Sequence, residues 1–230
     1  MTSTIPAYSC WRAAVTAPTR LKICGISQRV DAYTAIDAGA DALGLVFHPS
    51  SPRFIAPEQA AALTAALPPF VALVGLFVNR PVAEMVEVAR LCRLDTLQLH
   101  GDESPDHCLA LRQQTGCRLI KAIRVAGPDD LADVERYPVD ALLFDARVSG
   151  SFGGTGQCFD WSILTGSTAT LHHRWILAGG LTPDNVADAI RQTRPYAVDV
   201  SSGVESAPGQ KDADRIKRFA AATFSASSSC

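Results

Sequence analysis

Residues 21–47 read LKICGISQRVDAYTAIDAGADALGLVF. A short apolar run at 21–24 is followed by an amphipathic stretch at 29–38 and by a second apolar run at 41–47. Short apolar runs that alternate with segments of helical periodicity are typical of repeated βα units. This stretch therefore predicts two strands of one parallel sheet, joined by a helix.

The same alternation continues along the chain. Apolar runs that read as strands start near residues 21, 41, 71, 95, 118, 140, 174 and 196. Helix-like stretches are found at residues 29–38, 57–66, 81–91, 105–115, 128–136, 183–191 and 211–221, and several begin with proline, which suits a first helical turn. Eight units in about 200 residues favour a (β/α)8 TIM barrel. A doubly wound open sheet, which usually has five or six strands, is the alternative.

No linker divides this series, so residues 21–222 are predicted to form a single catalytic domain. Residues 1–20 contain two arginines, several Ser and Thr and no acidic residue, which gives them a faint similarity to a transit peptide. We predict that they form a flexible extension, and that residues 223–230 form a flexible tail.

Composition excludes several classes of protein. The 230 residues carry a formal net charge of -2, with a pI near 6.2, so there is no basic field to attract nucleic acid or an anionic membrane surface. No apolar run approaches the ~20 residues that a membrane span needs. Seven cysteines without a CxxC pair or a Cys/His cluster indicate free thiols in a reducing compartment, and we expect a cytoplasmic protein without a metal site.

Two candidate catalytic residues stand at strand ends, where a barrel places its active site. Cys24 closes the first strand, and alternation puts Lys22 on the same face, where its ammonium would favour a thiolate. A small buried residue is an equally good interpretation of Cys24. Asp145 closes the sixth strand and, taken alone, is more typical of a loop cap. Together, a thiol and a carboxyl on different strands can act as base and acid on one substrate.

The loops after the seventh and eighth strands favour a phosphate site. Barrels often bind phosphate at these two loops, together with a short extra helix. The first loop contains Gly179 and Gly180 and is followed by Thr182 and Pro183, which suit the start of a helix; the second reads SSGVE at 201–205. Main-chain N–H groups of both loops can hold a phosphate without a cluster of lysines or arginines. The alternative is that these glycines only form tight turns.

Three other features add weaker signals. Arg53, in the loop after the second strand, can form a bidentate pair with a substrate carboxylate, although a solvated arginine is the commoner case. Gln98 and His100 share a face at the end of the fourth strand, where a lone histidine is usually a structural hydrogen-bond partner. The glycine-rich segment 146–161 can close over a substrate or be a disordered surface loop. The dinucleotide and nucleotide-loop motifs are both absent, which argues against a nicotinamide enzyme and an NTPase.

Seven motifs together resemble one enzyme family. They are LKICGI, FHPSSPRFI, GLFVN, LQLHGDE, FDARVSGSFGGTGQCFDW, LAGGLTPDNV and VDVSSGVE, and they occur in this order between residues 21 and 219. In content and order they resemble the phosphoribosylanthranilate isomerases of tryptophan biosynthesis. The combination of KICG, GGTG followed by FDW, and DVSSGVE is highly specific, and no functional position departs from the pattern.

The resemblance implies a reaction and a role for each site residue. The reaction is the Amadori rearrangement of N-(5-phosphoribosyl)anthranilate to 1-(2-carboxyphenylamino)-1-deoxyribulose 5-phosphate. Cys24 would be the general base and Asp145 the general acid. Arg53 would hold the anthranilate carboxylate, and Asp199 would help to orient the substrate. The phosphate would lie against Gly179, Gly180, Ser202 and Gly203. Because the substrate nitrogen serves as the electron sink, no metal or organic cofactor is expected.

Two rival functions differ in their chemistry. Indoleglycerol-phosphate synthase catalyses a decarboxylative ring closure and relies on a catalytic Lys and Glu, whereas this first strand offers a thiol. A non-catalytic phosphate-binding barrel would keep the glycine loops without needing Cys24 or Asp145. The expected partner is a small phosphorylated molecule, neither nucleic acid nor membrane. Monomer and homodimer remain equally open.

Overall fold

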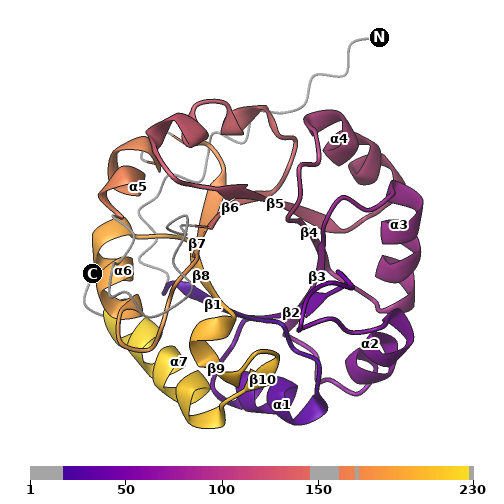
Figure 1. Cartoon of the computed structure of the whole chain (residues 1–230), viewed down its shortest axis with the longest axis horizontal. Coiled ribbons are helices and arrows are strands. Elements are labelled where there is room, and N and C mark those ends of the chain that lie inside the picture. Colours follow the sequence, from indigo (N-terminus) through magenta and orange to yellow (C-terminus); the bar gives the residue numbers. More distant parts are fainter. Residues whose placement is uncertain (1–17, 146–160, 169–170, 228–230) are drawn as a thin grey trace.

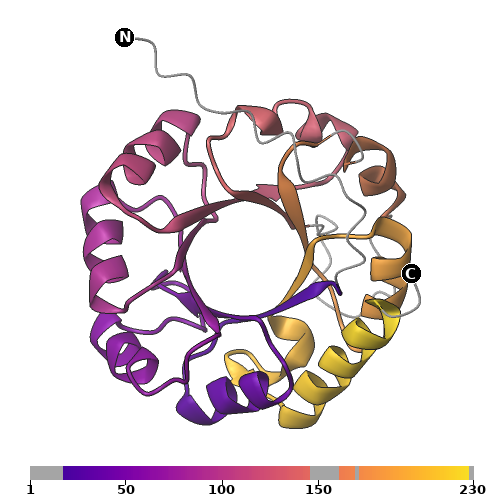
Figure 2. The same ribbon diagram turned by 180° about the vertical axis from the view of Figure 1, so that it is seen from behind.

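The computed structural model of the protein describes residues 18–145, 161–168 and 171–227. Eight parallel strands follow one another around a closed barrel in the order of the sequence. A ring of helices surrounds the strands in both views (Figure 1 and Figure 2). The strands are β1 (Arg20–Cys24), β2 (Ala42–Val46), β3 (Ala72–Phe77), β4 (Thr96–Leu99), β5 (Arg118–Arg124), β6 (Ala141–Asp145), β7 (Arg174–Ala178) and β8 (Ala197–Val200). The predicted barrel and its eight strands are confirmed.

The helices lie outside the strands, and a short hairpin follows β8 (Figure 1). The helices are α1 (Arg29–Asp37), α2 (Pro57–Thr64), α3 (Val82–Leu91), α4 (Pro105–Gln114), α5 (Ser162–Ser167), α6 (Val186–Thr193) and α7 (Ala213–Ser227). The hairpin consists of β9 (Glu205–Ala207) and β10 (Gln210–Lys211). None of the described helices is both long and apolar enough to cross a membrane.

The helix predicted at 128–136 is wrong. Two short 3₁₀ helices, Pro128–Leu131 and Val134–Arg136, occupy this segment instead. The Asp130 carboxylate accepts hydrogen bonds from the main-chain N–H groups of Ala126 and Gly127, at 2.7 and 3.0 Å. An acidic side chain that bonds to nearby main chain stabilises a local turn in place of a continuous helix.

The predicted flexible tail begins too early. Helix α7 continues to Ser227, because Thr223 and Ala226 are buried against the barrel and extend the apolar face of the helix beyond residue 222. At the other end, Arg20 already belongs to β1 and pairs with Ala197. The rest of the predicted extension, residues 1–17, and most of the glycine-rich loop, residues 146–160, lie outside the described residues.

Alternation along the strands divides the core into two layers. One set of side chains fills the barrel interior and includes Ile120 and Ala122 of β5, Leu143 of β6 and Ile176 of β7. The opposite set packs against the helices in a larger cluster. Both faces of each strand are thus buried, which explains why the strands read as nearly continuous apolar runs. The next inward-facing side chains toward the carboxyl ends of the strands, two residues further along, therefore point into the barrel mouth.

A buried ion pair fixes the loop that follows β4. Lys121 and Glu103 lie 3.0 Å apart, between Nζ and Oε2, and their side chains are 2% and 1% exposed. Lys121 also donates to the carbonyl oxygen of Gly101 at 2.7 Å, while Glu103 accepts from the N–H groups of Asn79 and Gly101. The pair therefore ties the loops after β3 and β4 to β5.

We expect Lys121→Met to lower the free energy of unfolding by about 3 kcal/mol, because it leaves the Glu103 carboxylate buried without its cation. Urea unfolding measures this loss. The control is Arg80→Met, which breaks an exposed pair with Glu84 whose side chains are 43% and 48% exposed and should have little effect. Equal losses in the two variants would contradict the structural role of the Lys121 pair.

Candidate active site

A cavity of about 680 Å³ opens at the carboxyl ends of the strands. Its walls come from strand ends and from the loops that follow them, as expected for a barrel enzyme. The structure brings all the candidate residues together there. The cavity is lined by Cys24, Arg53, Asp145, Gly179, Gly180, Asp199, Ser202 and Gly203.

Cys24 ends β1 beside a buried ion pair. The Lys22 ammonium donates to the Asp199 carboxylate at 2.9 Å, and both side chains are less than 10% exposed. Burial raises the pKa of the Cys24 thiol, and the Asp199 carboxylate raises it further, whereas the Lys22 and Lys211 ammonium groups lower it. The net shift is upward. Lys22 is near the thiol and lowers its pKa as predicted, but burial outweighs the nearby cations.

Asp145 ends β6 and contacts a histidine from β4. His100 Nε2 lies 3.4 Å from Asp145 Oδ2, and Gln98 Nε2 lies 3.0 Å from His100 Nδ1. With the Gln98 amide nitrogen donating to Nδ1, the ring proton on Nε2 faces Asp145. The predicted common face of Gln98 and His100 is confirmed. Their contact with Asp145 joins strands that are far apart in the sequence.

Arg53 is held by a carboxylate from the hairpin after β8, a strand that, like β2, pairs with β1. Its Nε and Nη2 donate to the two oxygens of Glu205 at 2.7 and 2.6 Å. Lys211 Nζ lies 2.8 Å from the same carboxylate. Burial alone would raise the pKa of Glu205, but the hydrogen bonds from Arg53 and Lys211 outweigh it and lower that pKa. The fork of Arg53 is thus fixed in place, and its remaining N–H groups stay available to a ligand.

Glu205 and Lys211 complete this group without any role predicted from the sequence. Glu205 was only the last letter of the SSGVE motif, and Lys211 was expected to begin a helix but lies in the β9–β10 hairpin. The two partners Arg53 and Glu205 are 152 residues apart in the chain. No local pattern signals such a contact.

The loops after β7 and β8 form a cradle of main-chain groups. Gly179 and Gly180 have φ values of 89° and 66°, in the left-handed region that favours glycine. A Cβ at Gly203 would lie only 1.9 Å from the Leu181 carbonyl oxygen, so the two loops can touch only with glycine there. A 3₁₀ helix, Ser202–Val204, follows β8, while α6 begins at Val186 rather than at 183.

This cradle contains polar groups that can receive a ligand. Within the described part of the chain, the N–H groups of Gly179 and Gly180 donate no hydrogen bond. The Ser201 hydroxyl is buried and has no hydrogen-bond partner among the described residues. Such groups suit an anion that accepts several hydrogen bonds at once. Among residues 18–145, 161–168 and 171–227, no cluster of three or more His, Cys, Asp or Glu side chains is arranged to hold a metal ion.

Comparisons with known proteins agree with this geometry. Residues 21–222 match the family model of N-(5'-phosphoribosyl)anthranilate isomerase. The isomerase of Magnetococcus marinus is 57% identical over 203 residues, which cover 88% of this chain and 94% of that protein. The crystal structure of the Thermotoga maritima isomerase has a TM-score of 0.83 and 41% identity, covering 89% of this chain and 98% of that one.

A further solved isomerase contains a bound ligand, reduced 1-(o-carboxyphenylamino)-1-deoxyribulose 5-phosphate. Its TM-score is 0.80 at 40% identity, and the match covers 89% of this chain and 98% of that one. The fold, the sequence identity and the family model all indicate the same family. The chain belongs to the N-(5'-phosphoribosyl)anthranilate isomerase family and is an isomerase.

Proposed function

We propose that this isomerase rearranges N-(5'-phosphoribosyl)anthranilate, a step of tryptophan biosynthesis, with Asp145 as general acid and Cys24 as general base. The observation that carries the proposal is the placement of this thiol and this carboxyl in one cavity, on the non-adjacent strands β1 and β6. A family relative with the reduced product bound supports the same substrate class.

The first step opens the sugar ring. Asp145 donates its proton to the furanose oxygen while the bond between C1 and that oxygen breaks. The electron pair of the substrate nitrogen forms the iminium at C1. Asp145 is left as a carboxylate, next to His100 Nε2–H, which can donate to it. His100 is therefore a positioning residue that orients the acid and stabilises its ionised form.

The second step transfers the C2 proton. The iminium makes this proton acidic, and the Cys24 thiolate removes it, so that the C2–H electrons form the C1–C2 double bond of a neutral enolamine. Protonation at C1 and loss of the hydroxyl proton then give the ketone. Burial makes the thiolate scarce in the free enzyme but strengthens it as a base, which suits a carbon acid.

The remaining site residues hold the two ends of the substrate. The phosphate binds to the cradle of Gly179, Gly180, Ser202 and Gly203. Arg53 uses its free N–H groups to bind the anthranilate carboxylate, and its fork on Glu205 keeps it in position. Asp199, which is fixed by Lys22, helps to orient the sugar hydroxyls. The substrate nitrogen serves as the electron sink, so no cofactor takes part in the scheme.

We expect Arg53→Ala to raise KM about tenfold or more while kcat stays within a few-fold, because a charged hydrogen bond to the substrate is lost in both the ground and transition states. Steady-state kinetics measure both constants. Arg80→Ala, an exposed arginine that does not line the cavity, is the control. An unchanged KM in Arg53→Ala would remove Arg53 from the binding site.

Mass spectrometry of the product formed in deuterium oxide tests the reaction type. An isomerisation gives a product of the substrate's composition with one carbon-bound deuterium at C1, because C1 receives a proton that exchanges with solvent. The decarboxylative ring closure needs the rearranged ketone as its substrate, so loss of carbon dioxide and water on incubation with 1-(2-carboxyphenylamino)-1-deoxyribulose 5-phosphate would instead indicate that reaction. No change in the substrate, with folded protein, would contradict the proposed activity.

We also propose a cytoplasmic location. Cys24, Cys92, Cys108 and Cys117 are free thiols, as expected for a reducing compartment.

The functional unit is a monomer or a homodimer: the Thermotoga maritima isomerase is described as dimeric, and monomers generated from it have been solved. Sedimentation velocity at enzyme concentrations near those of the assay distinguishes the two states.

A further inference from the structure

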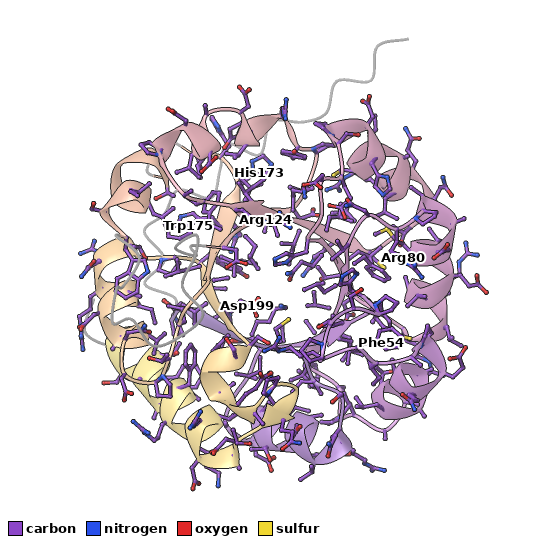
Figure 3. All side chains as sticks on the ribbon, viewed as in Figure 1. Phe54, Arg80, Arg124, His173, Trp175 and Asp199 are labelled. Carbon is purple, nitrogen blue, oxygen red and sulfur yellow. The ribbon has the colours of Figure 1, made fainter. Side chains whose placement is uncertain are left out.

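Arg124 is a cation in the barrel mouth that has no part in the scheme proposed above. It ends β5, and its Cα pairs with that of Asp145 on β6. Ala122 and Ile120, two and four residues earlier in the same strand, belong to the interior layer, so the Arg124 side chain points to the same side. Arg124, which is labelled in Figure 3, lines the same cavity as Asp145.

The Arg124 side chain differs from the other cations of the site in having no partner among residues 18–145, 161–168 and 171–227. Lys22 is paired with Asp199, and Arg53 and Lys211 share Glu205. The main chain of Arg124 belongs to the β5–β6 ladder, but its guanidinium, which lines the cavity, makes no hydrogen bond or ion pair with any described residue. A guanidinium without a partner at a binding site is suited to a planar anion of the ligand.

The position of Arg124 indicates which anion it meets. The phosphate cradle is on the loops after β7 and β8, and the reacting groups are at the ends of β1 and β6. The rest of the wall includes the apolar side chains Val46 of β2 and Leu76 of β3, together with Arg124 of β5. Apolar side chains suit an aromatic ring, so this part of the mouth faces the aryl end of the substrate.

Charge balance supports the same assignment. The proposed substrate carries a phosphate dianion at one end and an aryl carboxylate at the other. Glu205 offsets much of the positive charge of Arg53, because both of its oxygens accept from that guanidinium. A carboxylate has two oxygens and about four acceptor positions, enough for two guanidinium groups.

We propose that Arg124 binds the aryl carboxylate of the substrate together with Arg53, and that it makes the site selective for a carboxylated arylamine. This inference rests on the proposed function and adds a second residue to the binding of that carboxylate. It predicts that the contribution of Arg124 to ligand affinity depends on the ligand's carboxylate and not on its phosphate.

Calorimetric titration with two ligands tests this proposal. One is reduced 1-(o-carboxyphenylamino)-1-deoxyribulose 5-phosphate, and the other is the same molecule without its carboxylate. Arg124→Gln should raise the Kd of the carboxylated ligand about tenfold or more and leave the Kd of the other within twofold. Arg124→Lys should recover part of the loss, since it restores the charge without the fork.

Arg118→Gln is the matched control, because Arg118 begins the same strand at the opposite end and does not line the cavity. It should change neither Kd. Equal weakening of both ligands by Arg124→Gln, or no weakening of the carboxylated one, would overturn the proposal. If the wild type binds neither ligand, the proposed function itself fails, an outcome distinct from a loss of selectivity in the variant.

Discussion

Asp145→Asn should lower kcat by about a hundredfold or more, the loss expected when a general acid is removed. Asparagine keeps the shape of the side chain and can still contact His100, so the fold and the cavity are preserved. What disappears is the proton that must reach the furanose oxygen as the ring opens. Because the acid acts in the transition state, kcat should fall far more than KM rises.

The control for this variant is Asp140→Asn. Asp140 precedes β6 at the opposite end of the barrel, where it pairs with Arg112 at 2.9 Å and does not line the cavity. Its replacement should leave turnover unchanged. A rate in Asp145→Asn close to that of the wild type would show that another group supplies the proton, and would refute the role assigned to Asp145.

Cys24→Ala should also lower turnover about a hundredfold or more, because it removes the thiolate that accepts the C2 proton. Ligand affinity should change little, since Cys24 holds neither end of the substrate. Cys117→Ala removes a thiol that bonds to the Leu94 carbonyl oxygen outside the cavity, and it should keep full activity. Retained turnover in Cys24→Ala would exclude the thiol as the base.

The thiol pKa gives a second test of the Cys24 environment. Burial outweighs the nearby ammonium groups, so the pKa of Cys24 is raised above the ordinary value of 9.0. Below that pKa the thiol is protonated, and thiolate appears only as the pH passes it. The difference in thiolate ultraviolet absorbance between wild type and Cys24→Ser should therefore titrate above pH 9.0. A midpoint near 7 in the unliganded protein would contradict the dominance of burial.

The fold could be predicted from sequence because parallel strands buried on both faces leave short, continuous apolar runs. Even so, residues 128–136 have the length and proline start of a helix, and only the turn around Asp130 shows why they form 3₁₀ helices. The end of α7 was missed because Thr223, a polar residue, is buried in the apolar face of that helix. Such burial depends on tertiary packing rather than on local pattern.

The site was partly predictable for a similar reason. Strand ends meet at one rim of a barrel, so Cys24 and Asp145 could be placed together before any coordinates. The contacts that adjust them could not, because they join residues far apart in the chain. Arg53 with Glu205 is one example, and His100 with Asp145 is another. The net direction of the Cys24 pKa shift could not be predicted from the sequence either, since it depends on burial and on Asp199 as well as on Lys22.

The most direct test of the central claim follows anthranilate fluorescence after the purified protein is added to freshly generated N-(5'-phosphoribosyl)anthranilate. The wild type should remove the substrate signal rapidly, and Cys24→Ala and Asp145→Asn should each do so about a hundredfold more slowly or worse. Folded wild-type protein that leaves the signal unchanged would contradict the claim that this barrel is the isomerase.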